Sequence, residues 1–70
     1  MKVQIQHSIV QDMSVIKFNN LHDFFRCIDF LDNSCLEYDM IKYSSVLDTA
    51  SIRVNELVLH KFSKRFGIGK

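Results

Sequence analysis

The segment SIRVNELVLHKFSKRFG, residues 51–67, presents apolar side chains on two sides if it forms one helix. The first stripe consists of Val54, Leu57, Val58 and Phe62. The second stripe consists of Ile52, Leu59 and Phe66, which are spaced seven residues apart. A 70-residue chain hides only about 60% of the surface that its unfolded form exposes, so its one small core can cover one stripe. We therefore expect contact with a second chain to cover the other stripe.

The composition predicts one folded domain over residues 1–70, because 47% of the residues are hydrophobic and 24% are charged. The N-terminus MKVQIQHSIV alternates polar and apolar residues instead of forming an export signal. Cys27 and Cys35 are therefore expected to stay reduced in a cytoplasm. No apolar run reaches the roughly 20 residues of a membrane span, so we expect no membrane contact. Association with a partner is then the expected source of extra stability.

An antiparallel β-hairpin is predicted over residues 2–18. The segment KVQIQHSIV alternates with the period of a half-buried strand, and MSVIKF has the composition of a second strand. A short loop centred on Gln11 and Asp12 would join them. The apolar face of this hairpin would collect Val3, Ile5, His7, Ile9, Ile16 and Phe18.

A helix is predicted over residues 20–32. Asn20 is a favourable N-cap, and Asp23 places a negative charge where a helix start favours it. The expected apolar face consists of Leu21, Phe24, Phe25, Ile28 and Leu31. We expect this face to lie across the hairpin, because an isolated hairpin is marginally stable in water. Phe30 is expected to point away from it.

Residues 35–43 allow two interpretations. Ser34 and Glu37 have the spacing of a capping box, which favours a helix. The segment LEYDM alternates apolar and acidic residues, which favours a strand beside the hairpin. We prefer the helix because of the capping box.

A second helix is predicted over residues 46–66. Ser45 and Asp48 offer a start signal, and Gly67 stands where a helix C-cap is expected. The predicted fold class is therefore α+β: an N-terminal antiparallel β-hairpin followed by two or three helices, with a long C-terminal helix.

Catalytic, metal and cofactor sites are not expected. The chain has two glycines and lacks a Gly-rich phosphate loop, a nucleophile elbow and a paired-carboxylate motif with helical support. His22, Cys27 and Cys35, with His7 or His60, are the available metal ligands, but their spacing matches no common zinc signature. We therefore predict that the protein is not an enzyme and needs no cofactor.

The predicted interface is the second stripe of the C-terminal helix. Ile52, Leu59 and Phe66 would form a narrow straight seam along which two helices can pack, as in a coiled coil. Phe30, on the polar side of the first helix, would join the same patch. A homodimer is expected, because a two-fold axis makes one seam complement itself. The competing interpretation is that the rest of the domain wraps more of this helix.

The charges are unevenly placed, although the net charge is only +1. A predicted charged rim consists of Arg53, His60, Lys61, Lys64 and Arg65. It would steer an acidic partner or contact phosphates. A strand followed by two helices resembles, in topology only, the ribbon-helix-helix repressors, whose paired strands enter the major groove. Those proteins have one strand before the helices and this chain has two, so no residue is carried over.

The sequence thus favours a small non-catalytic protein-binding regulator or inhibitor that occludes the surface of a partner. The alternative is a small dimeric nucleic-acid-binding transcriptional regulator that uses the basic C-terminal helix, although a net charge near zero gives little phosphate affinity. Chains of this size and Ile/Lys/Phe/Asn-rich composition are common among phage and mobile-element host-control factors. We therefore expect a cytoplasmic protein, in a host cell if the chain is phage-encoded.

Overall fold

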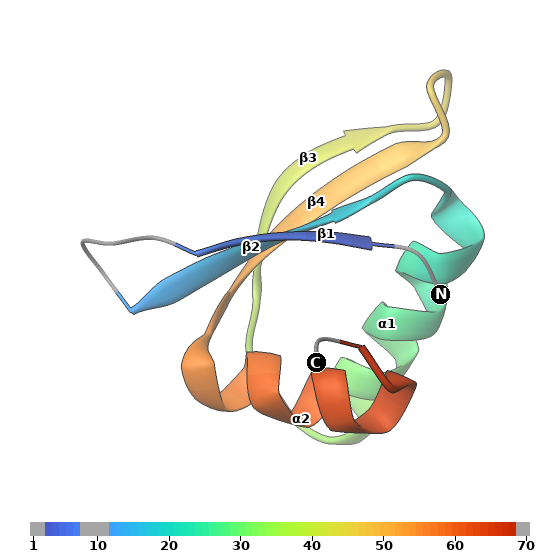
Figure 1. The fold of residues 1–70 in the computed structure, drawn as a ribbon. Coiled ribbons are helices and arrows are strands. Elements are labelled where there is room, and N and C mark those ends of the chain that lie inside the picture. Colours follow the sequence, from blue (N-terminus) through green and yellow to red (C-terminus); the bar gives the residue numbers. More distant parts are fainter. Residues whose placement is uncertain (1–2, 8–11, 69–70) are drawn as a thin grey trace.

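The computed structural model describes residues 3–7 and 12–68, whose elements follow the order ββαββα (Figure 1). The strands are β1 (Val3–His7), β2 (Met13–Phe18), β3 (Asp39–Ser44) and β4 (Thr49–Asn55). The helices are α1 (Leu21–Asn33) and α2 (Glu56–Phe66). The predicted α+β class is therefore confirmed.

The predicted N-terminal hairpin is also confirmed. β1 pairs antiparallel with β2. Val3 lies opposite Phe18, and Ile5 lies opposite Ile16. The two strands thus share the apolar face that their alternation predicts. Ile9 of the predicted apolar face and Gln11 of the predicted loop lie outside the described residues.

All four strands form one antiparallel sheet in the order β1-β2-β4-β3. β4 lies between β2 and β3, with Ile52 opposite Ile16 and Val54 opposite Ser14. β3 is an edge strand, and a register shift between Met40 and Lys42 interrupts its pairing with β4. The sheet therefore has a central pair, β2 and β4, that carries most of the buried strand residues.

The helix predicted over residues 20–32 is present as α1. The Asn20 side chain caps it by accepting a hydrogen bond from the backbone N–H of Asp23 at 2.8 Å. Its buried residues are Phe24, Cys27 and Leu31. Because they follow one another at intervals of three and four, the buried stripe is narrower than the predicted face, and Phe25 is left half exposed at its margin.

The helix preferred over residues 35–43 is wrong. Cys35 has a φ of 55°, and this left-handed residue ends the first helical segment instead of starting another. Asp39–Ser44 then form β3, so the strand alternative is the correct one. β3 pairs with β4, however, and not with the N-terminal hairpin.

The long helix predicted over residues 46–66 is wrong in its first half. A turn at residues 45–48 reverses the chain, with Asp48 at a φ of 58°, and Thr49–Asn55 form β4. The strand buries Ala50, Ile52 and Val54 at alternate positions against the helices. A helix would have scattered these three side chains around its axis.

The second half of that prediction holds, because Glu56–Phe66 form α2. The Asn55 side chain begins the helix by accepting a hydrogen bond from the backbone N–H of Val58 at 2.9 Å. Gly67 ends it as a left-handed C-cap with a φ of 67°, as its position predicts.

Both helices cover the same face of the sheet, which gives the domain two layers (Figure 1). The core between the layers consists of Ile16, Phe18, Phe24, Cys27, Leu31, Ala50, Ile52, Val54, Val58, Leu59 and Phe62. The other face of the sheet carries neither helix. In the described part of the chain, neither helix has the length and apolar character needed to cross a bilayer.

Candidate functional site

The predicted interface seam does not exist as a surface. Ile52 lies on β4 and is 0% exposed, and Leu59 lies on α2 and is 7% exposed. Both side chains belong to the core of their own domain, so they are not available to a second chain. The physical reason is the break at residue 56: Ile52 is on a strand, so it never shares a helix with Leu59. The competing interpretation, that the domain encloses its own C-terminal segment, holds for these two residues.

Phe30 and Phe66, the other two predicted interface residues, do meet. Their rings are 5.7 Å apart and cross at 83°, an edge-to-face contact between α1 and α2. Both side chains are half-buried and pack on the margin of the core. The predicted patch thus joins two helices of one chain.

The predicted charged rim is divided between the two layers. Arg53 lies on β4, and its guanidinium contacts the Asp39 carboxylate on β3 at 3.1 Å. By strand alternation it lies on the sheet face that carries neither helix. The remaining members are exposed on α2: His60, Lys61, Lys64 and Arg65. Arg53 therefore does not continue the basic side of the helix.

An exposed apolar surface lies on and around β3, where the capping box favoured a helix over the strand alternative. Seven large hydrophobic side chains of the described residues are at least 49% exposed, and six of them lie on β3, on the turn that follows it or on the adjacent part of α1. We call these six the β3 surface: Phe25, Met40, Ile41, Tyr43, Val46 and Leu47. The rings of Phe25 and Tyr43 are 6.5 Å apart, so α1 and β3 share this surface.

The turn between β3 and β4 holds the two most exposed members in place. Val46 is 91% exposed and Leu47 is 70% exposed. The backbone N–H of Leu47 donates to Ser44 Oγ at 3.0 Å, and the Asp48 carboxylate accepts from the N–H of Leu21 at 3.1 Å. Large apolar groups are thus displayed on a turn that two hydrogen bonds fix, at a cost in exposed apolar area.

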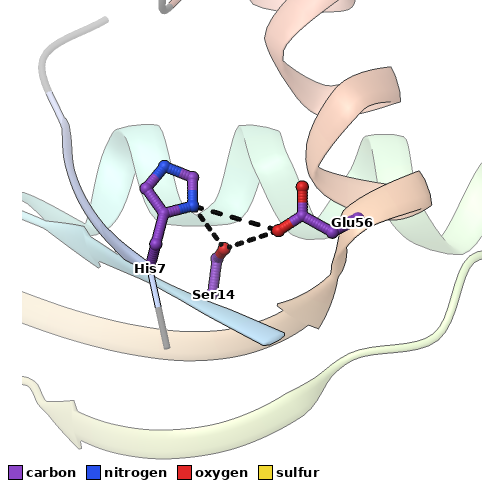
Figure 2. Close-up of polar contacts among 3 residues, drawn as sticks. All are labelled: His7, Ser14 and Glu56. Carbon is purple, nitrogen blue, oxygen red and sulfur yellow. Dashed lines mark hydrogen bonds and ion pairs between the residues drawn. The ribbon is translucent and has the colours of Figure 1, made fainter. Parts of the chain in front are cut away.

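A polar cluster joins β1, β2 and α2 (Figure 2). The Ser14 hydroxyl lies 3.1 Å from His7 Nδ1 and donates to Glu56 Oε2 at 3.4 Å. His7 Nδ1 and Glu56 Oε2 are 3.9 Å apart. In a Ser-His-acid relay, the serine and the acid meet opposite nitrogens of the imidazole. Here both meet Nδ1, and Ser14 is 0% exposed. The cluster therefore satisfies a buried hydroxyl and ties the three elements together.

The two cysteines occupy different environments. Cys27 is buried in the core, and this burial raises the pKa of its thiol from 9.0 to about 12, because the thiolate would lose its hydration. Cys35 is exposed after the end of α1. Within residues 3–7 and 12–68, no three His, Cys, Asp or Glu side chains converge on a point that could hold a metal ion.

Comparison of the chain with protein-family models, with curated proteins and with solved structures finds no match.

Proposed function

We propose that this chain is a small non-catalytic binding protein that regulates another protein by covering part of its surface through the β3 surface. The observation that carries the proposal is the gathering of six of the seven exposed large hydrophobic side chains on β3, its following turn and the adjacent turn of α1. Large exposed apolar side chains that lie on neighbouring segments are typical of interaction sites.

The position of β3 in the sheet supports the same proposal. β3 is an edge strand, so one row of its backbone N–H and C=O groups has no partner strand among the described residues. An extended segment of a partner gains main-chain hydrogen bonds at such an edge and specificity from the side chains beside it. The register shift at Met40 and Lys42 limits how many of those bonds one segment can make. Contact with the apolar side chains therefore supplies most of the affinity.

The test compares a double variant of the β3 surface with a control variant that introduces the same residue type elsewhere. Val46→Asp with Leu47→Asp places charges on the β3 surface, at side chains that contribute nothing to the core. Leu57→Asp is the matched control, because Leu57 is 60% exposed on α2 and outside the surface. With the protein as bait in extract of its source cells, a discrete partner should bind the wild type and the control but not the double variant. Equal retention by all three proteins would overturn the proposal.

Light scattering separates a foreign partner from a second copy. If the wild type is a dimer and the double variant is a monomer, the β3 surface is a homodimer interface instead. If the wild type has the mass of one chain, the partner that binds the β3 surface is another protein.

Nucleic-acid binding is the second candidate, and the exposed cations of α2 favour it. His60, Lys61, Lys64 and Arg65 all project from one helix that carries no acid after Glu56. Such a helix can lie against phosphates. Binding of a fluorescent duplex should then weaken steeply with salt, and Lys61→Glu with Lys64→Glu should abolish it. Absence of binding at low salt would leave the protein-binding proposal alone.

A further inference from the structure

A groove separates the C-terminal parts of α1 and α2 and has a volume of about 350 Å³. Its lining consists of Arg26, Asp29, Phe30 and Asn33 from α1 and Arg65 and Phe66 from α2. This volume is at the small end of the range for small-molecule sites, about 300–1,000 Å³. The groove lies apart from the β3 surface.

Two guanidinium groups share one aromatic ring in this groove. The Cζ atoms of Arg26 and Arg65 lie 5.5 Å and 5.3 Å from the centroid of the Phe66 ring. The ring itself is fixed by Phe30 and by Phe62, which is 0% exposed. Because a contact with a ring uses no hydrogen bond, the N–H groups of both guanidinium groups remain available to bind an oxyanion.

Asp29, the acid that lines this groove, forms an ion pair with neither cation. Neither guanidinium has a carboxylate within 4.0 Å or a hydrogen bond to another described residue. Arg65 lies in the last turn of α2, where a cation complements the helix dipole. That explanation does not apply to Arg26, which lies in the middle of α1. Two like charges around one ring repel each other, and a bound anion removes that repulsion.

The remaining lining groups indicate what the anion is attached to. Arg26, Asp29, Phe30 and Asn33 recur at intervals typical of one helix side, a stripe about 10 Å long at 1.5 Å per residue. Asp29 offers carboxylate acceptors for hydroxyl groups, and Asn33 offers an amide that both donates and accepts. Phe30 offers an apolar ring that is in edge-to-face contact with Phe66.

We propose that this groove binds a nucleoside monophosphate. Arg26 and Arg65 hold the phosphate, Asp29 accepts hydrogen bonds from the ribose hydroxyls, and Phe30 and Asn33 contact the base. In this assignment the Asp29 carboxylate, which repels the phosphate, has a role as the acceptor for the sugar hydroxyl groups.

Titration of the isotope-labelled protein with AMP, inorganic phosphate and adenosine, followed by NMR, tests the assignment. AMP should shift the side-chain resonances of Arg26, Arg65 and Phe30, and should bind more tightly than either fragment. Arg26→Gln and Arg65→Gln should each weaken AMP binding at least about tenfold. Arg53→Gln is the matched control, since Arg53 is outside the groove and paired with Asp39. Unchanged melting temperatures establish that the exposed substitutions leave the fold intact.

Asp29→Asn should raise one measured quantity and lower another. Inorganic phosphate should bind this variant more tightly, because a like charge is removed. The preference for AMP over its 2′,3′-dideoxy analogue should fall, because the ribose acceptor is weakened. Absence of shifts with millimolar AMP, or equal AMP affinity in the wild type and both arginine variants, would overturn the proposal. Phosphate binding to which the nucleoside adds nothing would overturn the nucleotide assignment.

Discussion

The Asp48 carboxylate accepts a hydrogen bond from the backbone N–H of Leu21 at 3.1 Å, which connects residues 27 positions apart. Leu21 is the first residue of α1, and its N–H is one of the four that a helix start leaves without an internal partner. Asn20 satisfies a second of these groups through Asp23. The turn between β3 and β4 thus stabilises the start of α1, and it also displays the apolar side chains of Val46 and Leu47.

Asp48→Ala should lower the free energy of unfolding by about 1–3 kcal/mol. The substitution removes the carboxylate acceptor and places alanine at a φ of 58°, a left-handed conformation that costs about 1–2 kcal/mol without glycine or a short polar side chain. Asp48→Asn is the control, because asparagine keeps an oxygen acceptor and tolerates this conformation. Urea denaturation measures both. An alanine variant as stable as the wild type would show that the turn does not support α1.

Asp48 also explains why the C-terminal half was harder to predict than the N-terminal half. With Ser45 it has the spacing of a helix start signal, yet it lies in a hairpin turn and caps a different helix. The N-terminal hairpin and α1 depend on local signals, the alternation of β1 and β2 and the Asn20 cap, and both were predicted correctly.

β4 was missed because Val54 fits both the two-residue period of a strand and the 3.6-residue period of a helix. Val54 belongs to the strand alternation of Ala50 and Ile52, but it also falls on a helical stripe with Leu57 and Val58. No glycine or proline marks the junction at Glu56, so the sequence alone did not separate strand from helix. The β3 surface was missed because the capping box of Ser34 and Glu37 favoured a helix over residues 35–43, whereas its side chains are exposed together only when β3 is an edge strand beside β4.

Leu59→Glu should unfold the domain instead of dissociating a dimer. Leu59 is 7% exposed, so the new carboxylate would be buried without a partner, at a cost of about 3 kcal/mol or more. Leu57→Glu, two residues earlier and 60% exposed, should change the free energy of unfolding by less than about 0.5 kcal/mol. Thermal melting distinguishes them. A folded, equally stable and monomeric Leu59→Glu variant of a dimeric wild type would restore the original interface seam.

Cys27 should make the domain less stable at high pH. The pKa of its buried thiol is raised to about 12, so the folded chain keeps this proton while the unfolded chain releases it above pH 9.0. Between these values the unfolded state binds fewer protons, and the contribution of this group to stability falls by about 1.4 kcal/mol per pH unit. Cys27→Ala lacks this contribution. Its free energy of unfolding, measured with reductant at pH 8 and pH 10.5, should fall less steeply than that of the wild type, and equal slopes would contradict the assignment.

Ser14→Ala should lower the free energy of unfolding by about 1 kcal/mol, through loss of the one hydroxyl that both His7 and Glu56 contact. The cost stays modest because the His7 and Glu56 side chains are 66% and 60% exposed and regain water once the hydroxyl is gone. A double-mutant cycle with Glu56→Ala should give a positive coupling energy, since each substitution removes the same hydrogen bond. Ser51→Ala is the control, because Ser51 is half-buried on β4 and lies on the sheet face opposite to Ser14.

If β1 is attached to α2 through this cluster, Ser14→Ala should also speed hydrogen exchange at the β1 amides more than at the β4 amides. Additive effects of the two substitutions together with unchanged exchange of β1 would mean that the three side chains meet without holding the hairpin to the helix.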